Sequence, residues 1–284
     1  MKRFTLLFVF VLTAHLLFAW GPNGHRIVAQ ICYDNLSANA RAKINRILGN
    51  NYMAQIATWP DFIRSEKNWD FTKNWHFITV DSGSTFKQVW ESSSMDPAIN
   101  NVAEAIDLME SILKNDAQAI RKFRLLMDSN HVKPLEGSII TTALAFLIHF
   151  MGDLHQPMHV GKGDDFGGNK VKVIFFSKES NLHSVWDEGI IEQEQLCFQE
   201  FSSFVQKHFL PQRKHFQKGT IDQWGEESIT AREGIYSTLY NNKDKKTGLP
   251  GFSYQYQHDN IETIEGRLAA AGYRAASILN AIFK

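Results

Sequence analysis

The chain has 284 residues, of which 30 are basic and 30 acidic, and hydrophobic residues make up 44%. This ordinary globular composition excludes a disordered or collagen-like chain. The absence of a basic excess also excludes overall charge as the main source of any affinity for nucleic acid.

Residues 1–19 have the pattern of a secretory signal peptide. Basic Lys2 and Arg3 precede an almost wholly apolar run over residues 4–18, and Ala19 supplies a small residue at the expected cleavage point. The alternative is an uncleaved membrane anchor, for which this run is short. We therefore expect a secreted or periplasmic protein that has no membrane association after cleavage.

Cleavage at this point would leave residues 20–284 as one domain that begins at Trp20. The chain contains two cysteines, Cys32 and Cys197. They exclude a disulfide framework and permit at most one bridge. Export would make that bridge chemically permissible, although the sequence does not show that the two residues meet.

The first half of the domain predicts two amphipathic helices. Ser37 is suited to N-cap a helix over residues 38–48, which Gly49 would end. A second helix is expected to open at Asp96 and Pro97, with the proline in its first turn. Apolar residues then recur at spacings of three and four, which predicts one apolar face: Ile99, Val102, Ile106, Met109 and Leu113.

The second half predicts a more apolar helix over residues 135–156, central in the fold and ended by Pro157. The alternating, β-branched segment 170–176 predicts one arm of a hairpin. Two long helices, around 221–241 and 261–282, close the chain. Because the strand signal is so small, we expect an all-α fold class: a single mainly helical domain with a small β-hairpin.

The strongest chemical signal lies at the end of the central predicted helix. His149 and Asp153 are four residues apart, so they share one face of an otherwise strongly apolar helix. Burying a histidine and a carboxylate is costly unless they are paired or bind a metal. A buried His–Asp hydrogen bond is one interpretation. His159, just past the proline, makes metal binding the better one.

A second pair repeats this spacing. His183 and Asp187 are again four residues apart and follow a glycine-rich loop over residues 161–169. Two such pairs in one chain are hard to explain by packing alone. Imidazole and carboxylate ligands without a thiolate are typical of a hydrolytic, water-bearing zinc site rather than a closed structural one.

Further candidates lie upstream. Asp61 and Arg64 are three residues apart on a predicted helix, and His76 lies between aromatic residues. Taken alone, such residues more often form a salt bridge or a satisfied core histidine. If the chain began at Trp20, its free α-amine and carbonyl oxygen could chelate a metal together with His25. The alternative there is a frayed N-terminus.

Taken in order, these motifs resemble the S1/P1 nuclease family, which shares its fold with zinc-dependent phospholipase C. The matching stretches are WGPNGH, WPDFIR, NWHF, HFMGDLHQPMH, GGN and NLHSVWD. The resemblance implies a mainly helical fold of the phospholipase C/P1 nuclease type, with three zinc ions (Zn²⁺) at the bottom of a cleft.

The resemblance also implies which residues hold each zinc ion. One ion would take Asp61, His76, His149 and Asp153. A second would take His159, His183 and Asp187. The third would take the amine and carbonyl of Trp20, His25 and the other oxygen of Asp153.

The implied activity is hydrolysis of single-stranded DNA and RNA to 5′-phosphorylated products, with 3′-nucleotidase activity on nucleotides. Asp153 would bridge a zinc pair that activates water, and Arg64 would hold a phosphate oxygen. Phe77 would stack on a base, and Asn169 would contribute to substrate binding. No stable protein partner is implied.

Two alternative functions stay open. One is a phospholipase C that acts on lipids through the same metals, and the other is a non-catalytic zinc-binding secreted protein. The sequence also departs from the family pattern. Fungal relatives contain disulfides, whereas this chain permits at most one. Thr79 stands where some fungal relatives have a base-contacting carboxylate, with Asp81 two residues on, so base preference stays open.

Overall fold

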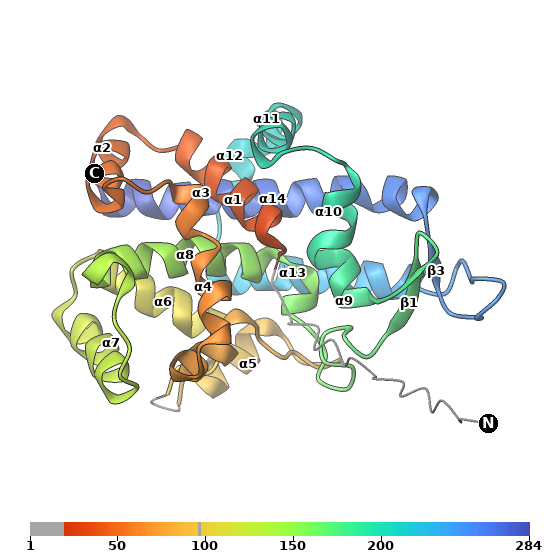
Figure 1. The fold of residues 1–284 in the computed structure, drawn as a ribbon, viewed down its shortest axis with the longest axis horizontal. Coiled ribbons are helices and arrows are strands. Elements are labelled where there is room, and N and C mark those ends of the chain that lie inside the picture. Colours follow the sequence, from red (N-terminus) through yellow and green to blue (C-terminus); the bar gives the residue numbers. More distant parts are fainter. Residues whose placement is uncertain (1–19, 96–97) are drawn as a thin grey trace, which may run out of the picture.

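A computed structural model describes residues 20–95 and 98–284 of the chain. The fold is mainly α-helical with a small three-stranded sheet, which confirms the predicted fold class (Figure 1). The predicted signal peptide and the predicted helix start at Asp96 and Pro97 lie outside the described residues. Within the described ranges, every helix is too short or too polar to cross a membrane.

The helices of the first half are α1 (Pro22–Asp34), α2 (Ala38–Leu48), α3 (Met53–Ile56), α4 (Trp59–Phe62), α5 (Phe86–Ser93), α6 (Val102–Leu113) and α7 (Ala117–Ser129). Those of the second half are α8 (Ile139–His155), α9 (Leu182–Ser184), α10 (Ile190–Gln193), α11 (Phe198–His208), α12 (Arg213–Phe216), α13 (Ile221–Thr238) and α14 (Tyr254–Ile282). Short 3₁₀ helices are η1 (Ile63–Ser65), η2 (Lys67–His76), η3 (Leu135–Gly137), η4 (Pro157–His159) and η6 (Leu210–Gln212), and η5 (Val185–Gly189) is π-helical.

The central helix is α8, which packs against α6 on one side and against α1 and α14 on the other (Figure 1). Its side chains are buried from Thr141 to its last residue. The prediction placed its start too early, at residue 135. Glu136 and Gly137 adopt left-handed backbone conformations with φ of 52° and 68°, which end η3 and separate it from α8. The helix ends before Pro157 because the residue preceding a proline is driven towards an extended conformation.

Other predicted boundaries are confirmed or corrected by local capping. Ser37 caps α2 by accepting a hydrogen bond from Ala40 N, and Gly49 follows with φ of 59°, as predicted. Asn101 caps α6, so Ile99 lies before the helix rather than on its apolar face. At the end of the chain, α13 stops at Thr238 and α14 begins earlier than predicted, at Tyr254. The first turns of α14 are mostly polar, so apolar periodicity could not reveal them.

The predicted hairpin is present as β1 (Lys172–Phe175) and β2 (Lys178–Asn181), which pair antiparallel. A third strand, β3 (Gly251–Phe252), pairs parallel with β1, with Ile174 opposite Gly251. Its two residues gave no strand signal in the sequence. The sheet lies at one end of the long helices α13 and α14 (Figure 1).

The buried apolar residues form two clusters, one built around α6 and α8 and the other around α1, α14 and the sheet. Helices α1 and α14 approach closely at Gly272, where an added Cβ would lie 2.5 Å from Ile31 Cβ. This contact packs α1 closely against α14 and beside α8. The polar residues described next come from helices of both clusters.

Candidate metal centre

Buried histidines and aspartates from distant segments converge at the C-terminal half of α8. They form three groups within which the possible ligand atoms all lie within 4.8 Å of one another. The groups are His25, His149 and Asp153; Asp61, His76 and His149; and His159, His183 and Asp187. The structure thus brings together all the side chains that the sequence singled out as metal ligands. The remaining predicted ligands are the main-chain amine and carbonyl of Trp20.

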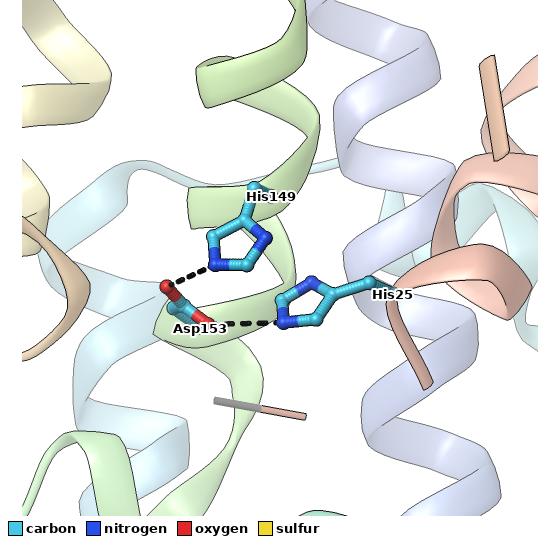
Figure 2. Close-up of side chains that lie close together, drawn as sticks. All are labelled: His25, His149 and Asp153. Atoms are coloured by element: carbon cyan, nitrogen blue, oxygen red, sulfur yellow. Dashed lines mark ion pairs between the residues drawn. The ribbon is translucent and has the colours of Figure 1, made fainter. Parts of the chain in front are cut away.

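Asp153 lies between histidines from two helices (Figure 2). Its Oδ1 is 3.5 Å from His25 Nε2, and its Oδ2 is 3.3 Å from His149 Nε2. The His25 and His149 rings stack with centroids 3.7 Å apart. Gly152 permits this approach of α1 to α8, since a Cβ there would lie 2.9 Å from His25 Nδ1. The two oxygens of Asp153 therefore face different imidazoles.

Asp61 and His76 complete the group around His149. His76 Nδ1 is 3.0 Å from both Asp153 Oδ2 and His149 Nε2, and His149 Nε2 is 3.6 Å from Asp61 Oδ1. Arg64 Nη1 lies 3.4 Å from Asp61 Oδ1. In place of the single helix that was predicted here, the chain forms α4 followed by the 3₁₀ turn η1. This arrangement still keeps Asp61 and Arg64 in contact.

The third group lies where η4, α9 and η5 meet. His183 Nε2 is 3.0 Å from Asp187 Oδ2, and His159 Nε2 is 3.7 Å from Asp187 Oδ1. Asn181 caps α9 by accepting a hydrogen bond from Ser184 N at 2.8 Å, and this cap fixes where the His183 helix begins. The helix that carries His183 therefore begins at Leu182, directly after its cap.

Backbone carbonyls orient three of the histidines. Nδ1 of His149 donates to Ala57 O at 2.8 Å, Nδ1 of His159 donates to His76 O at 2.6 Å, and Nδ1 of His183 donates to Gly167 O at 2.7 Å. With the proton on Nδ1, the lone pair of each ring is on Nε2 and faces the cluster. A hydrogen bond that fixes the tautomer in this way is typical of metal-binding histidines.

Several buried atoms of the cluster lack a hydrogen-bond partner: both ring nitrogens of His25, Nε2 of His76, Oδ1 of Asp153 and Nε2 of His159. Leaving buried polar atoms unpaired is costly, so such a concentration needs an explanation. A cation held by these lone pairs would satisfy them. The nitrogen and oxygen donors, without a thiolate, fit the ligand preference of zinc.

The electrostatics of the cluster favour the same explanation. Burial raises the pKa of Asp61 to about 7, although Arg64 opposes the shift. Burial and the neighbouring Asp61 raise the pKa of Asp153 well above its usual value. Burial lowers the pKa of His149 to about 3 and, with His149 as a neighbour, also lowers that of His25. The imidazoles of His25 and His149 are thus neutral, as metal ligands must be, whereas the neighbouring Asp187 raises the pKa of His183. A cation in the cluster would restore the carboxylate charges.

A cavity of about 170 Å³ opens beside the cluster and is lined by His76, Arg64, Phe77 and Asn169, among others. The Phe77 side chain is 41% exposed. Asn169 Nδ2 donates to Phe166 O at 2.8 Å, whereas its Oδ1 is buried without a partner. The three residues predicted to contact substrate therefore share one cavity with three histidines of the cluster, His76, His159 and His183. A larger groove, of about 880 Å³, lies between α1 and α11 and contains none of the cluster residues.

Two residues at the site were missed from the sequence. Phe166 lines the same cavity and is 63% exposed, but it lay unremarked within the glycine-rich loop. Gln156 is fully buried and contacts Asp187 through its side-chain amide. Glutamine is not a typical zinc ligand, so ligand spacing gave no reason to select it.

Trp20 is fully buried, and its indole Nε1 donates to Gly152 O at 2.8 Å. This bond places the first residue of the expected processed chain beside Asp153. Whether its α-amine binds a metal depends on cleavage after Ala19, which lies outside the described residues, so the chelate stays a prediction. Cys32 and Cys197 are free thiols, the first buried and the second exposed, so the permitted bridge is not formed in this structure.

A family model described as S1/P1 Nuclease matches residues 20–284. Among curated relatives, Endonuclease 3 of Arabidopsis thaliana is 29% identical, over 93% of this chain and 89% of its own length. Nuclease S1 of Aspergillus oryzae is 25% identical, over 95% and 93% of the two chains. Nuclease P1 of Penicillium citrinum is 26% identical, over 93% and 97%.

Proposed function

Because the chain belongs to the S1/P1 nuclease family, we propose that it is a zinc-dependent nuclease that hydrolyses single-stranded DNA and RNA. Its products would carry 5′-phosphates, and the same site would act as a 3′-nucleotidase on mononucleotides. The observation that carries this proposal is the meeting of three buried His/Asp groups, with unpaired lone pairs, beside one cavity.

Three zinc ions per chain are the proposed cofactors. The first would be held by Asp61, His76, His149 and Asp153, and the second by His159, His183 and Asp187. The third would be held by His25, the other oxygen of Asp153 and the main-chain amine and carbonyl of Trp20. The division of the Asp153 oxygens between His25 and His76 supports a bridging role for this carboxylate.

When bound, the zinc ions would supply an activated water and neutralise charge on the phosphate and the leaving oxygen. The chain's own residues would position the substrate. Arg64 is 20% exposed and anchored by Asp61, so its free guanidinium edge can bind a non-bridging phosphate oxygen. Phe77 offers a ring face on which a base can stack. Asn169 Oδ1 can accept a hydrogen bond from that base.

Stacking on Phe77 explains the proposed preference for single strands, because only unpaired bases can leave their neighbours and enter the cavity. The overall charge of the chain is balanced. Attraction of a polyanion would therefore come from local positive charge, supplied by the metal ions and Arg64. For the protein as a whole, we propose cleavage of a signal peptide over residues 1–19, followed by a secreted or periplasmic location.

One experiment tests the proposal directly. The processed protein beginning at Trp20 is analysed for zinc per chain and assayed on labelled single-stranded DNA, single-stranded RNA, duplex DNA and phosphatidylcholine. We expect three zinc ions and EDTA-sensitive cleavage of the single strands to 5′-phosphate ends. Hydrolysis of phosphatidylcholine without nuclease activity would establish a phospholipase C instead. Bound zinc without either activity would establish a non-catalytic zinc-binding protein.

A further inference from the structure

We propose that Gln156 is a positioning residue that holds Asp187 in place for metal binding and joins the His159–His183–Asp187 group to the Asp153 end of α8. This inference rests on the proposed zinc assignment. It concerns a residue that belongs to none of the three groups.

The side chain of Gln156 has both of its polar atoms engaged within the site. Its Nε2 donates to Asp187 Oδ1, and its Oε1 accepts a hydrogen bond from Met158 N. A backbone N–H can only donate, so Met158 fixes which end of the amide is the oxygen. The NH₂ end must therefore face the Asp187 carboxylate, so the hydrogen bond from Met158 N fixes the direction of this donor.

The main chain of Gln156 adds two further links. Its N donates to Asp153 O at 3.0 Å, and its O accepts from His159 N at 3.0 Å. The residue thus contacts Asp153, His159 and Asp187, which come from α8, η4 and η5. Pro157 ends α8 immediately afterwards. Gln156 is therefore the connection through which the end of this helix sets the position of the His159–His183–Asp187 group.

The contact with Gln156 leaves one oxygen of Asp187 for the metal. With Oδ1 held by the amide, Oδ2 lies 3.0 Å from His183 Nε2. Asp187 is itself buried, so removing the amide would leave a carboxylate oxygen without a donor and free the group to rotate. Loss of a hydrogen bond that orients a metal ligand lowers metal affinity by about 10- to 100-fold.

The test measures zinc release from Gln156→Leu and Gln156→Glu by competition with a chelator, with Asp187→Asn as a reference. The leucine variant removes the donor, and the glutamate variant replaces it with a second carboxylate oxygen. We expect one of three zinc ions to be released at about 10- to 100-fold lower chelator concentration, the same ion that Asp187→Asn loses, while the other two stay bound.

Gln206→Leu is the matched control, because the Gln206 amide also donates to a carboxylate, that of Asp34, far from the cluster. Retention of all three zinc ions at wild-type affinity in both Gln156 variants would overturn the inference. Loss of all three ions together, with a melting temperature lowered as much as in Gln206→Leu, would also overturn the inference, because this result indicates a general loss of stability. If the leucine variant does not fold, the nearly isosteric glutamate variant carries the test. Wild-type protein without zinc would instead refute the proposed function on which the inference depends.

Discussion

At the scale of single residues, the two oxygens of Asp153 face histidines from different elements, α1 and η2. Oδ1 faces His25 and Oδ2 faces His76. Asp153→Asn would replace one oxygen with an NH₂ group that cannot bind a cation. We expect this variant to lose turnover and to contain less zinc, as measured by cleavage of a labelled single strand and by metal analysis. Full activity would refute the bridging role.

Phe77 allows substrate binding to be tested separately from metal binding. Base stacking on an aromatic side chain contributes about 1–3 kcal/mol, so Phe77→Ala should raise KM for single-stranded DNA by about 10-fold or more. The zinc content should not change. Phe62→Ala is the control, because Phe62 is similarly exposed on α4 but does not line the cavity. An equal effect of the two substitutions on KM would argue against stacking at Phe77.

At the scale of secondary-structure elements, the position of His25 depends on the close packing of α1 against α14. Gly272→Ala would place a Cβ 2.5 Å from Ile31 Cβ, and such overpacking costs about 1–3 kcal/mol. Gly234→Ala in α13 meets nothing within 4 Å and should stabilise the protein by up to about 1 kcal/mol, through helix propensity. Denaturant unfolding of both variants measures the contrast. Equal changes in stability would show that this helix crossing is not tightly packed.

The elements also show what the sequence could predict. Ser37 and Gly49 carry local capping chemistry, so α2 was predicted with its correct bounds. The His–Asp spacings predicted that His149 and Asp153, and likewise His183 and Asp187, would come together, because the helical period places such residues on one face. The start of α8 was misplaced because the break depends on the left-handed conformation of Glu136, for which a non-glycine residue gives little signal. Gln156 was missed because its role arises from tertiary contacts with Asp187.

At the scale of the whole molecule, the proposed metal ions would connect segments that are far apart in the chain. The ligand groups come from α1, α4, η2, α8, η4, α9 and η5. A ligand that binds only the folded state stabilises it by about 2.7 kcal/mol when present at 100 times its Kd. EDTA should therefore lower the melting temperature strongly in the wild type and less in Asp187→Asn, which has fewer ions to lose. A melting temperature unaffected by EDTA would show that metal binding contributes no stability.

Processing of the chain would change the metal ligands available at Trp20. Trp20 is fixed by burial and by the bond from its indole to Gly152 O, so cleavage after Ala19 would place a new amine in the immediate vicinity of Asp153. An amide nitrogen, unlike a free amine, has no lone pair available for a metal. A protein that retains one extra methionine before Trp20 should therefore bind two zinc ions, whereas the processed protein should bind three. Metal analysis of both proteins is the measurement, and three ions in the extended protein would contradict the N-terminal chelate. With this chelate, the third metal site would be complete only after removal of the signal peptide, so the enzyme would gain full activity only once it has been exported.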